Sequence, residues 1–443
     1  MEPVLSRGAG LDVHKKWIVV CVLIRLADGR LQRETRTFGT STRQILELAD
    51  WLAQVGVTEV AMESTGVLWK PVYNLLDGRF KLLVCNAAHI RNVPGRKTDV
   101  KDAEWIAELL LYGLLRASFV PPRPIRELRD LTRERSALVA DRVRVANRIE
   151  KVLEDANLKL QAVASNVLGV SGRLILNALL AGERDAARLA ALARGKLCAK
   201  KAELTEALNG RVTEHHVFML RQALQQVDSL DAQVEAYSER VAEVQAREDQ
   251  AQAQQEAGGG TGATGTGPAD SAAGQARGQL SYGAAMRALK SIPGVARKVA
   301  EVVISEIGLD MSRFGGSADR LASWAGVCPG NNESAGKILS GKTRKGNRYL
   351  RSILCEAAWA AWRAKPNFLR SQFTRLARRR GAKRAAMAVG HSILRIMFQI
   401  LSTGTLYEEL GADYHERLDA TRLTRYLVRR LEKLGHRVVL ATA

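Results

Sequence analysis

The chain has 443 residues, enough for two or three domains, and carries 67 Lys and Arg against 46 Asp and Glu, a formal net charge of +21. This excess of positive charge indicates an acidic binding partner, and the usual one is nucleic acid. No run of 18 apolar residues and no apolar leader are present, so we expect neither a membrane span nor a signal peptide. Five scattered cysteines argue against a disulfide framework or a zinc ribbon and favour a cytoplasmic protein with reduced thiols.

The first hundred residues alternate between strand and helix patterns. Residues 9–26 run into a β-branched stretch that predicts one strand, Asp28-Gly29 is a hairpin turn signal, and a second strand is expected at 31–38. The pattern then predicts a helix at 41–54, a buried strand at 57–62, a helix at 67–76, a strand at 81–85, a loop at 86–97 and a helix starting near Asp99. This order predicts an α/β layer fold with a mixed sheet.

The middle of the chain has the periodicity of long helices. Apolar residues spaced alternately by three and four run from Leu128 to Ala156 and again from Val217 to Val244, a coiled-coil pattern. A long helical hairpin with short helices between its arms is the simplest arrangement, and it could also form a dimer seam. The Gly-rich residues 256–279 are expected to be a flexible tether that marks a domain boundary.

The C-terminal part combines a turn motif with a basic surface. Residues 292–295, Ile-Pro-Gly-Val, precede a helix to about 307 and predict a helix-hairpin-helix, whose turn presents N–H groups to a phosphate. A helix at 321–325, a polar loop at 329–347 and helices from 348 follow. Residues 341–384 contain fourteen Lys and Arg and one acidic residue, Glu356, which favours contact with a phosphate backbone. The interleaved aromatics are expected to be core, and the last forty residues predict a helix and a short strand.

Four carboxylates are candidate metal ligands. Asp12 lies in the first strand, Glu63 ends a buried strand, and Asp99 and Asp102 share one face of a predicted helical first turn. Singly, each has an ordinary alternative as a turn residue, a cap or a partner of the helix dipole. Together they can converge on one edge of the sheet, as in an RNase H-like site, where Mg²⁺ would be the natural ion.

Other polar residues have competing interpretations. Ser334 and Ser340 lie in the Gly-, Asn- and Lys-rich loop. They are either polar residues that keep the loop soluble or candidate nucleophiles that attack a phosphate. His14 is interpreted as a strand-edge surface residue rather than a base. His215 and His216 are interpreted as a helix surface rather than a metal pair, because no third ligand is near.

Several ordered motifs resemble those of the DEDD transposases of the insertion-sequence 110 family, more particularly its 1111-type branch. The resemblance covers nearly the whole chain apart from the Gly-rich tether and the last forty residues. The motifs lie at residues 10–15, 62–66, 97–103, 292–295, 325–329 and 344–351.

The resemblance implies a set of domains and site residues. A RuvC/RNase H-like domain at 1–120 would bind Mg²⁺ through Asp12, Glu63, Asp99 and Asp102. A helical dimerisation region at 121–255, a linker at 256–279, a transposase domain at 280–403 and a C-terminal extension at 404–443 would follow. The catalytic serine is carried onto Ser334, and Ser340 remains a competitor because the loop spacing departs from the family pattern.

The resemblance also implies an activity and partners. Such enzymes cut and rejoin DNA through a transient phosphoserine, while a non-coding bridge RNA pairs with donor and target DNA. They act as homo-oligomers, here a dimer or a tetramer, with the carboxylates of one protomer facing the serine of another. Two alternatives stay open: a RuvC-like structure-selective endonuclease in which water attacks, and a non-catalytic nucleic-acid-binding protein.

Overall fold

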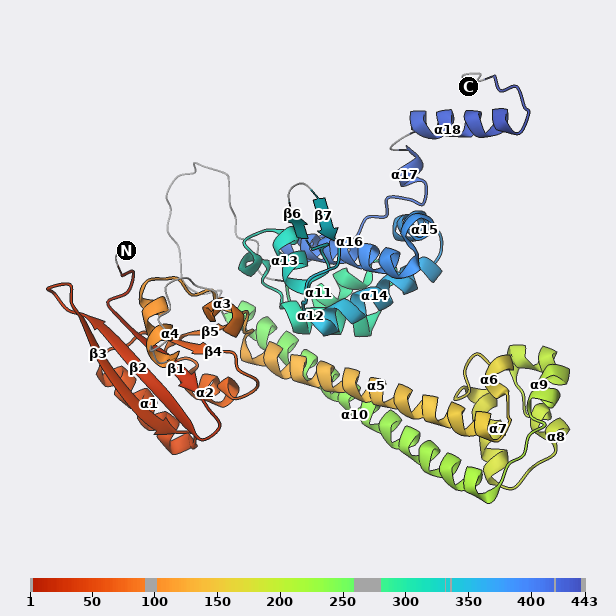
Figure 1. Ribbon diagram of the computed structural model, residues 1–443, viewed down its shortest axis with the longest axis horizontal. Helices are drawn as coiled ribbons and strands as arrows, with labels where there is room; N and C mark the ends of the chain where they lie inside the picture. Colours follow the sequence, from red (N-terminus) through yellow and green to blue (C-terminus); the bar gives the residue numbers. More distant parts are fainter. Residues whose placement is uncertain are drawn as a thin grey trace. The chain divides into compact units, whose positions relative to one another are not determined.

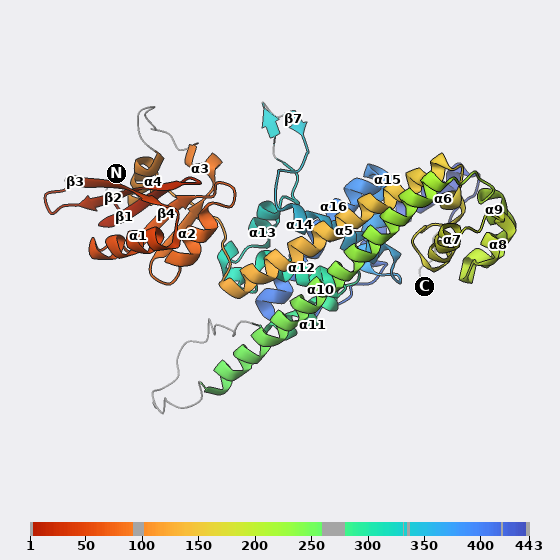
Figure 2. The ribbon, with the colours of Figure 1, turned by 90° about the horizontal axis from the view of Figure 1, so that it is seen from below.

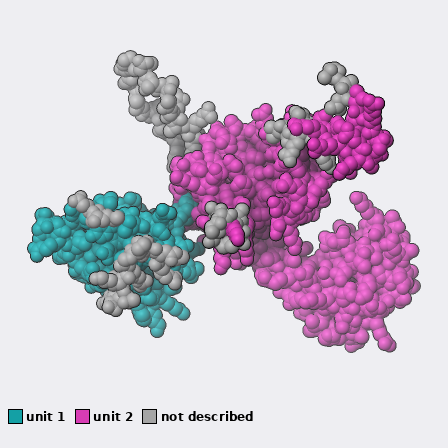
Figure 3. Space-filling model, turned by 45° about the horizontal axis from the view of Figure 1, so that its top comes forward, with its two compact units in different colours: residues 1–121 teal, residues 122–443 magenta. Residues whose placement is uncertain are grey.

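The computed structural model describes residues 3–91, 102–258, 280–330, 332–334, 337–417 and 420–439 (Figure 1). The chain divides into two compact units, residues 1–121 and residues 122–443 (Figure 3). Each unit is described by itself below.

Unit 1 is built on a five-stranded mixed sheet, which confirms the predicted α/β class. The strand order is β3-β2-β1-β4-β5. β1 pairs antiparallel with β2, and β2 with β3, whereas β1 and β4, and β4 and β5, are parallel. The strands are β1 (Arg7–Val13), β2 (Trp17–Arg25), β3 (Leu31–Gly39), β4 (Glu59–Glu63) and β5 (Lys81–Cys85).

Helices cover both faces of this sheet. The helix α1 (Thr42–Gln54), capped by the Ser41 side chain, and α2 (Trp69–Leu76) bury leucine, isoleucine and valine side chains against one face. The opposite face is covered by α4 (Asp102–Leu111), with the short α3 (Ala87–Arg91) before it. Figure 2 shows the sheet nearly edge-on between the two sets of helices.

Two predictions for unit 1 are wrong in detail. The stretch expected to be one strand at 9–26 is two, β1 and β2, joined by a tight hairpin in which the His14 N–H donates to the Trp17 carbonyl. The loop contains Lys15 and Lys16 but neither glycine nor proline, so no turn could be predicted there from the sequence. The helix α3 also replaces the start of the expected loop at 86–97. The Asp28-Gly29 turn is confirmed, with Gly29 at φ 81°.

Unit 2 begins with a pair of long antiparallel helices, as the two apolar seams predict. These are α5 (Arg123–Asp155) and α10 (Glu214–Gly258). Their opposite directions follow from two ion pairs: Glu127, near the start of α5, pairs with Arg247, late in α10, and Arg142, past the middle of α5, pairs with Asp231, earlier in α10. We call this pair the stalk.

The far end of the stalk is the one where α5 ends and α10 begins. It carries short helices with their own apolar core. They are α6 (Leu160–Val163), α7 (Val170–Leu180), α8 (Ala186–Ala191), η1 (Gly195–Lys200) and α9 (Lys201–Ala207). The surface interpretation of His216 is wrong. Its side chain is buried, its Nε2 lies 2.9 Å from Asp155 Oδ2, and its Nδ1 accepts from Thr213 N–H, so it fastens the start of α10 to the end of α5.

The near end of the stalk shares one core with the C-terminal helices, because Leu128, Val241 and Val244 pack in the same apolar cluster as that bundle. The bundle consists of α11 (Tyr282–Lys290), α12 (Arg297–Ile307), η2 (Met311–Phe314), α13 (Ala318–Ala325), α14 (Arg348–Arg363), α15 (Phe368–Arg380) and α16 (Ala382–Thr403), and it is followed by α17 (Tyr414–Arg417) and α18 (Ala420–Lys433). Among the described residues after α18 no strand forms, so the short strand expected there is wrong up to residue 439.

Only α16, among the described helices, is long and apolar enough to cross a membrane. It is a core helix instead, because 56 % of its most apolar 18-residue stretch is buried inside the protein, including Val389, Ile393 and Met397.

Candidate active site

Two of the predicted carboxylates lie side by side at the edge of the unit 1 sheet. Leu11 of β1 is in register with Met62 of the parallel β4, so the residues that follow them, Asp12 and Glu63, sit at the carboxyl ends of adjacent strands. Sequence predicted that the carboxylates could meet at one edge of the sheet, but it placed Asp12 near the start of one long strand at 9–26, whereas Asp12 lies near the end of β1. The Thr65 hydroxyl donates to Glu63 Oε1 at 2.6 Å and holds that carboxylate in place.

Helix α4 brings the third carboxylate, and Gly10 makes this possible. A methyl group added at Gly10 would lie 2.3 Å from the backbone nitrogen of Ala107 and 2.4 Å from the carbonyl oxygen of Ala103. The backbone of α4 therefore rests directly on β1. Asp102, the residue before Ala103, is consequently placed beside Asp12, two residues after Gly10.

We expect Gly10→Ala to separate α4 from β1, to lower the free energy of unfolding by about 1–3 kcal/mol or more, as overpacking does, and so to lower the melting temperature. Because the change moves Asp102 away from Asp12, the strand transfer that the sequence resemblance implies should fall with it. Thermal unfolding and a strand-transfer assay measure the two effects. Gly8→Ala is the matched control on the same strand, because its methyl group would meet side chains and no backbone, the nearest being Leu110 at 3.1 Å. Equal stability of both variants would contradict this role of Gly10.

The three carboxylates lie near enough for the charges of two of them to act on Asp12. Burial raises the pKa of Asp12 above its ordinary value, and the negative charges of Asp102 and Glu63 raise it further. His14 acts in the opposite direction, since its Nε2 lies 2.9 Å from Asp12 Oδ2. Three carboxylates that repel one another are a donor set for a hard divalent cation.

The fit to a metal is incomplete within the described residues. Over that part of the chain, no three Asp, Glu, His or Cys side chains converge closely enough to hold one ion. Asp99, the fourth predicted ligand, lies outside the described residues. The chemistry of Asp12, Glu63 and Asp102 still fits Mg²⁺, which prefers carboxylate oxygen and retains water ligands.

The predicted polar loop at 329–347 contains a short hairpin that sequence did not predict. Its strands are β6 (Asn332–Ser334) and β7 (Lys337–Ser340), and Figure 2 shows β7 standing out from the helices of its unit. Ser334 is paired with Lys337 at the tip, whereas Ser340 is opposite Asn332 near the base. The Ser340 hydroxyl accepts from the Lys342 N–H at 3.1 Å, so Ser340 already has a structural role in the turn that follows β7.

Close backbone packing fixes the base of this hairpin. The Gly330 N–H donates to the Lys342 carbonyl at 3.0 Å, and Pro329 bridges to Thr343. A methyl group on Gly346 would lie 2.3 Å from the Ala325 carbonyl oxygen, so only glycine allows the return segment to cross the end of α13 this closely. We call residues 329–347 the serine hairpin.

The predicted helix-hairpin-helix forms two helices, but its glycine faces the protein. Gly294, at φ 85°, lies against α14, where an added methyl group would meet the Ala357 carbonyl oxygen at 2.4 Å. The exposed part of this motif is the start of α12, with Arg297 and Lys298. The packing on α14 accounts for the glycine without a phosphate.

The basic surface predicted at 341–384 is present. Every Lys and Arg of that segment except Arg351 is exposed. Its aromatics are core, as expected: Trp359 and Phe373 have ring centroids 4.9 Å apart, and Phe373 is fully buried. The charges, rather than the rings, are therefore the candidate nucleic-acid surface of this unit.

We expect replacement of the three arginines at 378–380 by Gln to weaken DNA binding and to reduce its salt dependence. Each lost phosphate contact lowers the slope of log affinity against log salt by about 0.9. Binding measured across a salt series tests this. Gln at Arg188, Lys200 and Lys201, exposed residues on the far end of the stalk, removes the same charge and should leave the slope nearly unchanged. Equal losses in both variants would assign the effect to net charge alone.

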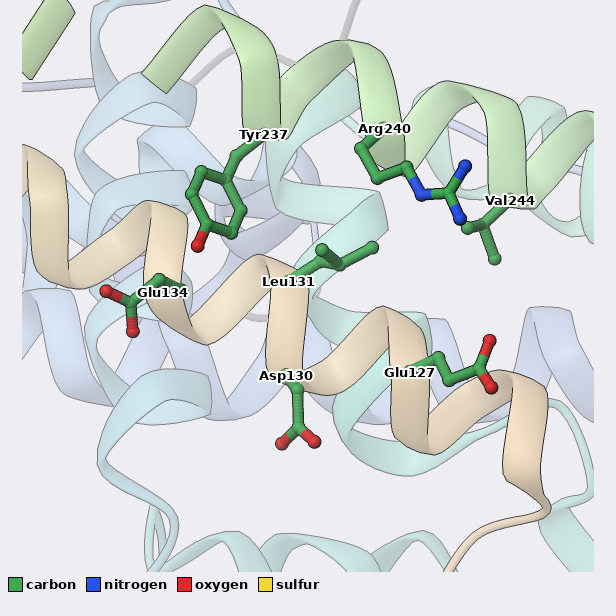
Figure 4. A pocket seen from close by; sticks show the side chains of 7 residues that line it. All are labelled: Glu127, Asp130, Leu131, Glu134, Tyr237, Arg240 and Val244. Carbon is green, nitrogen blue, oxygen red and sulfur yellow. The ribbon is translucent and has the colours of Figure 1, made fainter. Parts of the chain in front are cut away.

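An open groove of about 500 Å³ lies between α5 and α10 (Figure 4). Glu127, Asp130 and Glu134 line it from α5, and Tyr237 and Arg240 from α10. Its acidic wall is unsuited to phosphate, and it contains none of the candidate site residues.

Comparison with known proteins agrees with this arrangement of acidic sheet edge and basic helical unit. A family model described as "Transposase", that of the DEDD type, matches residues 9–158, and the chain is thus a DNA transposase. A second model, described as "Transposase IS116/IS110/IS902 family", matches residues 286–372. The chain belongs to the insertion-sequence 110 family of transposases, whose DEDD members are generally metal-dependent. A search of curated proteins found no match.

Proposed function

We propose that this transposase is an RNA-guided recombinase that cuts and rejoins DNA through a serine nucleophile, with Mg²⁺ bound by Asp12, Glu63, Asp99 and Asp102. The observation that carries the proposal is the placement of Asp12 and Glu63 at the carboxyl ends of adjacent parallel strands, with Asp102 near enough for its charge to raise the pKa of Asp12. The strand order β3-β2-β1-β4-β5, with carboxylates at the ends of its two central parallel strands, supports a RuvC/RNase H-like domain at 1–120.

The serine of the hairpin supplies the covalent step. The hydroxyl oxygen of Ser334 attacks a backbone phosphorus, a phosphoserine ester forms, and one phosphorus–oxygen bond of the DNA breaks. The proton of the serine hydroxyl is transferred to the departing DNA oxygen, which leaves as a hydroxyl. Attack on the phosphoserine by a hydroxyl of another strand reverses these changes and joins the two DNAs.

The other residues stabilise charge and position. Bound Mg²⁺ supplies positive charge against the phosphate oxygens in transit. Lys342, Arg344 and Lys345 follow β7 directly, are exposed, and attract the phosphate toward the hairpin. Ser334 is assigned as the nucleophile, and not Ser340, because it lies at the tip of the hairpin, whereas the Ser340 hydroxyl is engaged at the base.

The remaining parts of the proposal concern organisation. We assign residues 121–255 to a coiled-coil dimerisation region, 256–279 to a linker, 280–403 to the transposase domain and 404–443 to an extension. The protein is proposed to act in the cytoplasm as a dimer or tetramer on donor and target DNA, with a bridge RNA that supplies sequence choice. The positive charge of the chain supports contact with both nucleic acids.

The proposed RNA guidance has a direct test. Strand exchange is reconstituted from purified protein, Mg²⁺, donor and target DNA, and RNA transcribed from the flank of the element. We expect no exchange without the RNA, and a changed target site when the pairing segment of the RNA is changed. The scrambled RNA of equal length is the control. Exchange at one unchanged site in the absence of RNA would contradict the proposal.

A further inference from the structure

Helix α12 carries two carboxylates in the interior of unit 2. Every residue from Val299 to Ile307 is buried, and among them Glu301 is 2 % and Glu306 0 % exposed. A buried carboxylate is costly unless cations and hydrogen-bond donors surround it. The positions of these donors therefore show what α12 is bound to.

Apart from Arg297 of α12 itself, whose Nε donates to Glu301 Oε1 at 2.8 Å, the cations that bind these carboxylates come from the stalk. Arg133 of α5 binds Glu306 with two hydrogen bonds, Nε to Oε1 at 2.7 Å and a terminal nitrogen to Oε2 at 2.8 Å. Arg129, one turn earlier, donates to the backbone carbonyls of Ser305 and Glu306, at 3.0 and 2.8 Å. Arg135 pairs with Glu301 at 2.7 Å. Burial lowers the pKa of Arg129 to about 10, which leaves it charged at neutral pH.

Glu306 also binds the serine hairpin. Its Oε2 accepts from the side-chain nitrogen of Asn347 at 2.5 Å, and Asn347 is the last residue of the hairpin segment. The Asn347 Oδ1 accepts from the N–H groups of Tyr349 and Leu350, at 3.0 and 3.1 Å, and so caps α14. One carboxylate thus joins three elements: α12, the stalk helix α5 and the junction between the hairpin and α14.

The Tyr349 ring adds a second link between the same elements. The guanidinium of Arg133 lies 4.9 Å from the ring centroid, and that of Arg348 lies 4.7 Å from it. Arg133 therefore contacts both Glu306 and the first turn of α14. Cation–π contact and a bidentate ion pair both fix the direction of the guanidinium plane.

We propose that Glu306 is a positioning residue for DNA strand transfer: through Asn347 it fixes the serine hairpin to the stalk helix α5. The inference rests on the proposed function in so far as the hairpin carries the nucleophile. Because α5 and the hairpin return segment bind one carboxylate, a rotation of the stalk changes the position of the hairpin. Arg133 and Glu306 are 173 residues apart in the sequence, and Glu306 and Asn347 are 41 residues apart.

The decisive variant is Asn347→Ser. Serine retains an N-cap oxygen for α14 but has no amide nitrogen to donate to Glu306. We expect the maximal rate of strand transfer to fall about 10- to 100-fold, the effect of a small misplacement of a reacting group, with DNA affinity and melting temperature nearly unchanged. Hydrogen exchange at the Gly330 amide should accelerate, while the amides of α14 stay protected. The exchange measurement is independent of catalysis.

Two further variants separate positioning from simple stability. Arg133→Lys breaks the bidentate contact, and the Arg133→Lys/Asn347→Ser double variant should be no slower than the slower single variant, because both act through Glu306. Arg142→Lys is the matched control on α5, since Arg142 pairs in the same bidentate way with Asp231 of α10 but does not contact α12 or α14. It should transfer strands at the unmodified rate.

The outcomes that would overturn the inference are specific. Wild-type strand transfer and unchanged Gly330 exchange in Asn347→Ser would do so, and so would a loss of rate matched by a large fall in melting temperature. Failure of the proposed serine chemistry is distinguishable. If Ser334→Ala and Ser340→Ala both transfer strands normally while Asn347→Ser does not, the nucleophile assignment is wrong and the positioning role of Glu306 stands.

Discussion

Ser334→Ala is expected to abolish DNA strand transfer, with a loss of at least about three orders of magnitude. Alanine has no oxygen to attack phosphorus, and the loss of a covalent nucleophile has effects of this size or larger. A strand-transfer assay on DNA that carries the ends of the element measures the rate, and a binding assay checks that affinity for DNA is retained. Because the change removes one oxygen near the tip of a surface hairpin, the melting temperature should hardly move.

The matched control for this prediction is Ser340→Ala. Ser340 lies on the other strand of the same hairpin, where its hydroxyl accepts from the Lys342 N–H. We expect this variant to keep most of its activity, with a modest loss from a looser turn. Full activity of Ser334→Ala together with inactivity of Ser340→Ala would reverse the assignment. DNA cleavage that persists in both variants, without strand transfer, would favour the endonuclease alternative, in which water attacks.

Asp102→Asn is the second change with a large expected effect. Asparagine keeps the shape of the side chain and the start of α4, but it removes one of the three negative charges gathered at the sheet edge. We expect strand transfer to fall by about three orders of magnitude or more, as for removal of an essential catalytic group. DNA binding, which we assign to the basic surface of unit 2, should persist.

The same variant can also be tested by thermal unfolding, which does not depend on catalysis. Repulsion among Asp12, Glu63 and Asp102 destabilises the metal-free protein, so added Mg²⁺ should raise the melting temperature of the unmodified chain. Asp102→Asn should melt slightly higher without Mg²⁺ and respond less to its addition. Glu104→Gln is the control on the same helix, because Glu104 pairs with Arg33 at 2.7 Å and belongs to a different set of contacts. An undiminished Mg²⁺ response in Asp102→Asn would contradict the ligand assignment.

Local patterns predicted much of this fold. The alternation of β-branched strands and capped helices predicted the mixed α/β unit, and the spacing of apolar residues after Leu128 predicted the stalk. The end of β1 near Asp12 was not predicted, because residues 9–26 have the pattern of one strand, but Glu63 was recognisable as the end of a buried strand. These features depend on near neighbours in the chain, where periodicity and turn residues carry the information.

Features set by distant contacts were not predictable. In the sequence, Gly10 cannot be distinguished from any other glycine in a strand. Only the packing of α4 shows that a side chain at this position would displace Asp102. The hairpin at Asn332 and Ser340 is too short and polar for a strand pattern. Glu306 reads as one acid in an apolar helix, because its partner Arg133 lies in another part of the chain.

The measurement that tests the central claim most directly is the trapping of a covalent protein–DNA adduct. Purified protein, guide RNA, Mg²⁺ and a nicked DNA substrate are mixed, quenched with denaturant, and the adduct is digested and mapped by mass spectrometry. The account predicts a phosphoserine ester at Ser334 that is absent in Ser334→Ala and reduced in Asp102→Asn. DNA cleavage or strand transfer at normal rates, with no adduct or with an adduct on another residue, would contradict it.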